Sequence, residues 1–199
     1  LPKKVLRQFV DKPLIARTIE AGLESNTIDS VIVSTDDSEI SRVCIDLGVD
    51  QVISRPKELA TDEASSIDVL LHAIEELSLE GQEYGFVALL QPTSPLRNFR
   101  HIDGAFDLML TKNASAVIGV CETEHPMEWM TTLPPDFSMK SFFSRIWSDF
   151  PVKAKLLGYQ INGAIYLYDV EVLLRTKSGF PETDVYAFLM NRNVSVDID

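Results

Sequence analysis

Short apolar runs alternate with amphipathic stretches along most of this chain. The runs at 31–33, 86–90 and 116–120 are continuous, as in strands that are buried on both faces of a sheet. The stretches between them carry apolar residues at the three- and four-residue spacing of a helix. This alternation predicts an α/β fold with a mostly parallel sheet and helices on both faces. Such sheets bind ligands beyond the carboxyl ends of their strands.

The remaining elements follow from the same two patterns. Pro13 suits the first turn of a helix, and Gly48 is placed to end another. A chain of 199 residues is expected to form a single domain, 1–199. Helical spacing predicts helices at 14–23, 40–47, 67–77, 102–109 and 170–174, and apolar runs predict further strands at 52–53, 161–168 and 185–190.

The regular alternation stops at about residue 122 and resumes at about residue 158. The segment 122–158 contains four prolines and several aromatic residues without a clear period. Aromatic side chains in an irregular segment suggest a surface that is covered by something else, such as a second subunit or a closing lid. The alternative is a long loop that folds back on its own core.

Net charge, cysteine content and the length of the apolar runs limit the partners and the cellular compartment that we expect for this chain. The formal net charge of −12 argues against a nucleic-acid-binding surface. Cys44 and Cys121 are isolated and lie in apolar runs, which favours buried free thiols in a reducing cytoplasm over a disulfide. No run reaches the ~18 apolar residues that a membrane span needs. We therefore expect a cytoplasmic protein that binds neither nucleic acid nor membrane.

The two aspartates at the end of the chain are candidate metal ligands. If 195–199 is an extended strand, Asp197 and Asp199 share one face, and Val196 and Ile198 face the core. Two adjacent carboxylates repel each other unless a cation lies between them, and Mg²⁺ bridged to phosphate is a common solution. The alternative is a solvated acidic pair, which is frequent on acidic surfaces.

Basic and hydroxyl residues form two further clusters. Lys3, Lys4 and Arg7 precede the first helix and could hold phosphates, although basic loop residues are often only solvated. Arg55 offers bidentate hydrogen bonds, and Ser66 lies where a helix begins. This second cluster is compatible with nucleobase or phosphate recognition and equally with simple helix capping.

The loop 91–97 leaves a buried strand directly and is stiffened by two prolines. Its first residue, Gln91, carries both donors and acceptors and is suited to ligand recognition in a preorganised pocket. Later in the chain, Asn162 precedes Gly163 inside an expected strand. A glycine there permits the close approach of a ligand or another backbone.

Six strings of the sequence together resemble the CMP-N-acylneuraminate synthetases, the cytidylyltransferases that activate sialic acid. They occur in family order across nearly the whole chain, and they read LPKK-x-LR, VIVSTDD, SRP-x-ELA-x-D-x-ASS, LLQPTSPLR, NGAIY and SVDID. The resemblance implies a Rossmann-like α/β nucleotidyltransferase with a small protruding dimerisation element, which 122–158 would form. It implies transfer of CMP from CTP to a nonulosonic acid by a homodimer.

The resemblance also implies roles for individual residues. Asp197 and Asp199 match the family's Mg²⁺-binding aspartates, and Lys4 matches a basic residue near the triphosphate. Arg55 and Ser66 match positions of the family's nucleotide pocket. The family's substrate-binding positions correspond to Gln91, Gln160 and Asn162. A family of enzymes for another sugar acid, 3-deoxy-manno-octulosonate, fits the strings less well, and a catalytically silent nucleotide-binding homologue is the other alternative.

Three features of the family pattern bear on the substrate and on experiments. Val5 stands where the family usually has Asn. Gln160 stands where several members have Arg, which leaves open a variant nonulosonic acid such as a legionaminic-type one. The family's glycine-rich R-x-x-S-K-G loop precedes the residues that match Leu1, so experiments require the full-length gene product.

Overall fold

A four-stranded mixed sheet forms the centre of the computed structural model, which describes residues 3–61, 63–149 and 158–198. Its strands are β5 (Phe86–Leu89), β6 (Ala116–Glu122), β7 (Tyr159–Asp169) and β8 (Val185–Leu189), in the order β5-β7-β6-β8. β7 runs antiparallel to both β5 and β6, and β6 runs parallel to β8. The prediction of a mostly parallel sheet is therefore wrong in this part, because a buried apolar run does not specify the direction of its strand.

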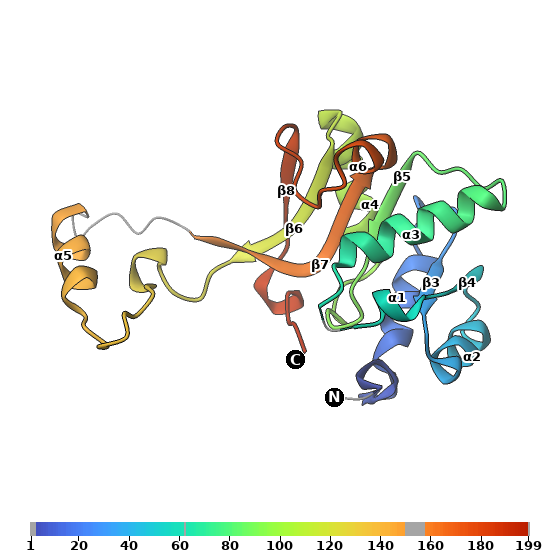
Figure 1. Ribbon diagram of the computed structural model, residues 1–199, viewed down its shortest axis with the longest axis horizontal. Coiled ribbons are helices and arrows are strands. Elements are labelled where there is room, and N and C mark those ends of the chain that lie inside the picture. The colour runs from blue at the N-terminus through green and yellow to red at the C-terminus, as the bar shows by residue number, and fades with distance from the viewer. Residues whose placement is uncertain (1–2, 62, 150–157, 199) are drawn as a thin grey trace.

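A parallel pair of strands lies beside α1 (Leu14–Leu23) and α2 (Ser38–Asp46) and is formed by β3 (Ile32–Thr35) and β4 (Gln51–Ser54). The chain enters this part through η1 (Lys4–Leu6) and a short hairpin of β1 (Gln8–Phe9) and β2 (Lys12–Pro13). A small cluster of Ile15, Ile19 and Cys44 holds α1 against α2 and β3. Figure 1 shows this blue part of the chain below and beside the central sheet.

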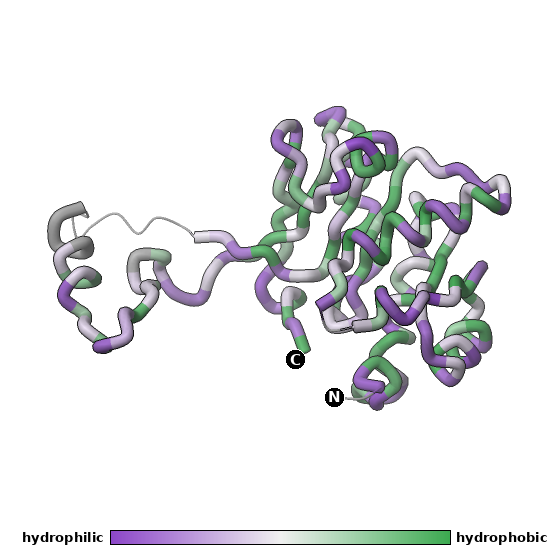
Figure 2. The backbone as a smooth tube through the Cα atoms, viewed as in Figure 1, coloured by the Kyte–Doolittle hydropathy of each residue, from purple (hydrophilic) through white to green (hydrophobic). Residues whose placement is uncertain are grey.

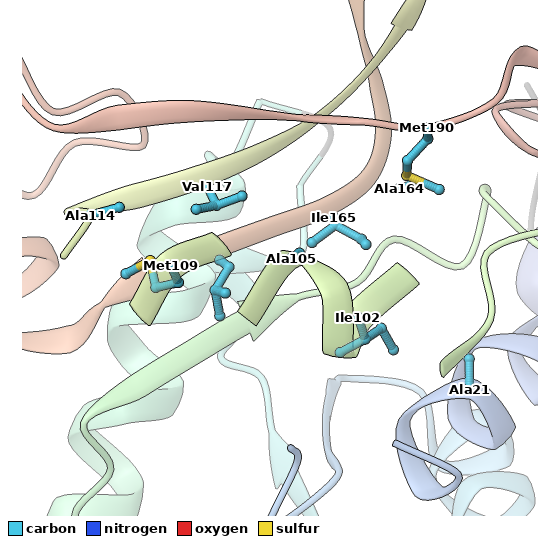
Figure 3. Close-up of a cluster of buried hydrophobic side chains, with 10 residues drawn as sticks. Ala21, Ile102, Ala105, Met109, Ala114, Val117, Ala164, Ile165 and Met190 are labelled. Carbon is cyan, nitrogen blue, oxygen red and sulfur yellow. The ribbon is translucent and has the colours of Figure 1, made fainter. Parts of the chain in front are cut away.

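Helices cover both faces of the central sheet, as predicted. Val117 packs with α4 (Phe99–Lys112), whereas its neighbours in β6, Ala116 and Ile118, pack with α3 (Ser66–Leu79) and α6 (Val170–Thr176). Adjacent residues of a strand point to opposite faces, so α4 lies on one face and α3 with α6 on the other. In Figure 3 the α4 side chains Ile102, Ala105 and Met109 lie next to Val117 and Ile165 of the strands.

The segment between β6 and β7 projects away from the rest of the molecule. Figure 1 shows it as a yellow and orange arm that carries η3 (Met127–Trp129) and α5 (Lys140–Asp149). A hydrogen bond of 2.9 Å from the Thr123 N–H to the Gly158 carbonyl closes the base of the arm. The arm coincides with the predicted insertion 122–158, of which residues 150–157 lie outside the described residues. It does not fold back on the core, unlike the alternative considered from the sequence.

Candidate functional site

The two ends of the described chain meet at one edge of the molecule (Figure 1). Lys4 Nζ donates a hydrogen bond to the Ile198 carbonyl at 2.9 Å. The Ile198 N–H in turn donates to the Thr93 carbonyl at 3.0 Å, in the loop that follows β5. The C-terminal segment therefore lies between η1 and the loop 91–97. Asp197, the residue before Ile198, belongs to this junction.

The C-terminal segment is not the strand that alternation predicted. Residues 195–198 follow η4 (Arg192–Val194) as irregular backbone, and Val196 is 45% exposed instead of facing the core. The hydrogen bonds to Lys4 and Thr93 fix this segment without a strand partner. Asp197 is exposed. Asp199 lies outside the described residues, so a shared face for the two acids stays a prediction.

Gln91 begins a loop that is fastened to β7. The Ser94 N–H donates to the Gln91 carbonyl at 3.2 Å, and the buried Ser94 Oγ donates to the Asn162 carbonyl at 3.4 Å. Gly163 has a φ of 72°, and a Cβ built on it would lie 2.9 Å from Gln91 Oε1. The Gln91 side chain thus rests against the one residue type that leaves it room, which explains the Asn-Gly pair.

Asn162 lies in an irregularity of β7, where its pairing with β6 shifts register between Ile118 and Val120. Its Oδ1 accepts from the Ala164 N–H at 3.1 Å, and its Nδ2 donates to Ser195 Oγ at 2.9 Å. The side chain is 5% exposed. Its amide therefore joins the bulge to the segment that carries Asp197. Direct contact of Asn162 with substrate stays a prediction.

Arg55 lies at the carboxyl end of β4 and is bound to the neighbouring strand. Its Nη2 donates to the Ser34 carbonyl at 2.5 Å, and its Nε donates to Ser34 Oγ at 3.3 Å. Burial lowers the pKa of Arg55, and the negative charge of Asp36 opposes that shift. The guanidinium is half-buried, so part of it remains open to a ligand at this edge.

Asp37, which follows β3, has a structural role as the N-cap of α2. Asp37 accepts from the backbone N–H groups of Glu39 and Ile40 at the start of α2. It also lies 3.4 Å from Lys3 Nζ, so Lys3 is engaged by acids of this loop. Of the two lysines, Lys4 is the one that reaches the C-terminal segment.

Three predicted residues, Arg55, Ser66 and Gln160, are not joined to this junction by hydrogen bonds within the described chain. Ser66 is exposed at the first residue of α3, and its neighbour Ser65 provides the N-cap by accepting from the Ile67 N–H at 3.1 Å. Gln160 is exposed on β7 opposite Cys121, close to the base of the arm. Their nucleotide and substrate roles stay predictions.

Sequence reasoning assigned no role to two residues of the same region. The pKa of Tyr166 in β7 is raised by burial and further by the negative charge of Asp197. Arg97 is 2% exposed at the end of the loop 91–97. Both are part of quoted strings, but arginine is seldom buried, and the sequence gives no sign that this one is.

Comparison with known proteins places the fold and the family. A family model described as cytidylyltransferase matches residues 1–135. The chain belongs to the cytidylyltransferase family. A solved structure of CMP:2-keto-3-deoxy-manno-octonic acid synthetase complexed with CTP aligns with a TM-score of 0.67 at 19% identity, covering 96% of this chain and 84% of the other. At that identity the likeness shows the nucleotidyltransferase fold alone.

Curated cytidylyltransferase relatives align with the whole chain. The N-acylneuraminate cytidylyltransferase of Escherichia coli is 36% identical over 200 residues, which are 100% of this chain and 46% of the relative. The pseudaminic acid cytidylyltransferase of Campylobacter jejuni is 32% identical over 205 residues, 100% of this chain and 85% of the relative. These relatives confirm the resemblance seen in the six strings. The chain spans about half the length of the N-acylneuraminate cytidylyltransferases that it matches.

The donor set of the candidate site fits one kind of magnesium site. Among the described residues no three His, Cys, Asp or Glu side chains gather in a group that could enclose a metal ion. Mg²⁺ commonly uses one or two carboxylates and completes its shell with water and substrate phosphates. The exposed carboxylate of Asp197 suits that open arrangement.

None of the helices in the described part of the chain is long and apolar enough to cross a membrane.

Proposed function

We propose that the protein transfers CMP from CTP to the anomeric hydroxyl of a nonulosonic acid and releases pyrophosphate. The observation that carries this proposal is the junction of Lys4, the segment of Asp197 and the loop of Gln91 at one edge of an α/β domain. Relatives named for N-acylneuraminate, pseudaminic acid and diacetyllegionaminic acid support the substrate class, because all three sugars are nonulosonic acids.

The chemistry needs charge and orientation more than covalent participation by the protein. The anomeric oxygen attacks the α-phosphorus of CTP, the bond between that phosphorus and the pyrophosphate oxygen breaks, and the proton of the hydroxyl is released to solvent. Lys4 uses one of its three N–H donors on Ile198, which leaves two for phosphate oxygens. Arg55 adds a second fixed cation at the same end of the molecule. Positioned charges of this kind lower the barrier without reorganisation.

The acidic and amide groups complete the proposed site. Asp197, together with Asp199, would hold Mg²⁺, which when bound neutralises phosphate charge. Gln91 would orient the sugar acid, since its amide can both donate and accept. Gln160 and Asn162 are proposed for the sugar side and Ser66 for the nucleotide side. The exposed position of Gln160 is compatible with contact to a bulky sugar substituent.

The decisive assay measures pyrophosphate release by the full-length protein with CTP, Mg²⁺ and a panel of sugar acids. The panel contains N-acetylneuraminic, pseudaminic and legionaminic acids, with 3-deoxy-manno-octulosonate as the rival substrate. We expect turnover with at least one nonulosonic acid and little with the octulosonate. Release with the octulosonate alone would favour the rival reaction. No release with any member would indicate a silent nucleotide-binding homologue.

Replacement of Asp197 tests the proposed metal ligand. We expect D197N to lower kcat about 100-fold, or about 2.7 kcal/mol of barrier, because the amide no longer offers a charged oxygen to the cation. D107N is the matched control, since Asp107 is exposed on α4 and lies outside the proposed site. Folding of both variants is checked by thermal unfolding. A D197N rate within tenfold of the parent contradicts the role.

We also propose that the arm joins two copies of this chain in a cytoplasmic homodimer. Exposed apolar side chains along the arm support this proposal, among them Met127 at 58%, Leu133 at 54% and Phe137 at 74%. In Figure 2 the arm stands apart from the body, and none of its described residues belongs to the hydrophobic core clusters. A projecting element with exposed apolar residues is expected to be covered by a partner.

A further inference from the structure

A buried arginine lies between the loop of Gln91 and the bulge of β7. Arg97 is the last residue before Asn98, the N-cap of α4, and it is 2% exposed. Burial lowers the pKa of its guanidinium to about 10, so the group is still charged at neutral pH. Within the described chain no carboxylate forms an ion pair with it, and its Nε has no hydrogen-bond partner. A buried charge without a counter-ion is costly and needs a reason.

The two terminal nitrogens of Arg97 connect three separate segments. Nη1 donates to the Ala164 carbonyl at 2.8 Å and to the Gln91 carbonyl at 3.2 Å. Nη2 donates to Thr18 Oγ1 in α1 at 2.7 Å. The planar fork of arginine fixes the relative directions of these bonds, which a lysine ammonium does not.

Two of these segments are the loop that carries Gln91 and the β7 bulge against which the Gln91 side chain lies. Arg97 holds the backbone of Gln91 through its carbonyl. It also holds Ala164, the residue after Gly163, whose missing side chain leaves the space for Gln91 Oε1. The same bulge carries Asn162, which is hydrogen-bonded to Ser195 near Asp197. One guanidinium thus fixes both the residue proposed to orient the sugar acid and the surface beneath it.

We propose that Arg97 is a positioning residue for the sugar side of the site: it holds Gln91 and the 162–164 bulge in the spacing that the sugar acid requires. This inference rests on the proposed function for its substrate. It acts through Gln91 and not by contact with the substrate, because the guanidinium is buried and its terminal nitrogens are bonded to protein.

The kinetic test compares R97M and R97K with the parent in the pyrophosphate assay. We expect R97M to lower kcat/KM for the sugar acid at least tenfold, while KM for CTP stays within about threefold. R97K should recover part of the loss, because it restores charge without the fork. The control is R100M, since Arg100 is exposed on α4 and contacts the Phe99 ring. It should remain within twofold of the parent.

A double variant separates positioning from general loss of structure. If Arg97 acts partly through Gln91, adding R97M to Q91A should cost clearly less than R97M costs in the parent. Multiplication of the two single effects would overturn the proposal, as would equal losses toward CTP and sugar acid. Should R97M not fold, R97K and T18V replace it in the same cycle, because T18V removes only the Nη2 acceptor.

Amide hydrogen exchange tests the positioning role of Arg97 independently of turnover. In R97K we expect faster exchange at residues 91–97 and 162–164, with unchanged exchange in the pair of β3 and β4. Unchanged exchange at 91–97 and 162–164 would overturn the positioning role. If the parent turns over no sugar acid at all, the proposed function fails, and this exchange comparison still accepts or rejects the role of Arg97 in holding the loop and the bulge.

Discussion

At the scale of single residues, Val10 is held in an unfavourable backbone conformation. It has a φ of 64° in the turn between β1 and β2, where Phe9 pairs with Lys12, and its side chain is 86% exposed. A β-branched residue rarely adopts positive φ, and a two-residue hairpin turn favours glycine there. The exposed side chain gains little packing to offset this cost.

Replacing Val10 by glycine should therefore stabilise the protein. We expect V10G to raise the free energy of unfolding by about 0.5–1 kcal/mol, because relief of strain exceeds the added chain entropy of glycine. For a domain of this size the melting temperature should rise by about 1–4 °C. V10A is the control and should gain little, since alanine keeps the Cβ. A lower melting temperature for V10G contradicts this account.

Several residues show how far sequence reasoning reached and where it stopped. The Asn162-Gly163 pair predicted the close approach of a ligand or another backbone, and the structure places the Gln91 side chain there instead. Gly119 is a signal that was missed: a Cβ there would lie 2.8 Å from Asn162 Oδ1, and an isolated strand glycine often marks a bulge. The burial of Arg97 was not predictable, because it depends on carbonyls from segments far apart in the chain.

At the scale of elements, the helices and strands of the body were predictable, but the direction of β7 was not, and neither was α5, which lies in the segment 122–158 that was expected to be irregular. Helical spacing placed α3 and α4 because each buries one apolar stripe against the sheet. The apolar pattern of β7 would be the same whether the strand ran parallel or antiparallel to its neighbours. The C-terminal segment was mistaken for a strand because alternation over 195–199 is too short to tell a strand from irregular backbone held by two hydrogen bonds.

The N-terminus of α4 contains a capping box that depends on pH. His101 Nδ1 accepts from the Asn98 N–H at 3.1 Å, and Asn98 Oδ1 accepts from the Arg100 N–H at 3.1 Å. Burial lowers the pKa of His101, and the positive charge of Arg97 lowers it further. A protonated Nδ1 cannot accept, so this cap requires the neutral imidazole.

We expect the stability contributed by His101 to be lost as the pH falls. Its folded-state pKa is below the unfolded value of 6.5, so the contribution is complete above pH 6.5 and declines as the pH falls through the folded pKa. The matched variant is H101Q, because Gln can cap from the same position without titrating. Urea midpoints at pH 7 and pH 5 should fall more for the parent than for H101Q. Equal falls would show that His101 does not contribute.

At the scale of the whole molecule, the arm projects away from the body (Figure 1). Two buried core clusters lie on the central sheet and its helices and a third lies between α1, α2 and β3, and the proposed site lies where η1, the loop 91–97 and the C-terminal segment meet. The arm leaves from the ends of β6 and β7, next to the exposed Gln160. A partner that covers the arm would therefore also approach the sugar side of the site.

Polar substitutions in the arm test whether it forms the dimer interface. We expect L133S/F137S to shift the full-length protein from dimer to monomer in light scattering after size exclusion, with dissociation at least tenfold easier, or ~1.4 kcal/mol. The matched control is L79S, because Leu79 is 78% exposed at the end of α3 on the body. It should leave the mass unchanged. A dimeric L133S/F137S protein, or a monomeric parent, would mean that the arm's exposed apolar residues do not join two copies of this chain.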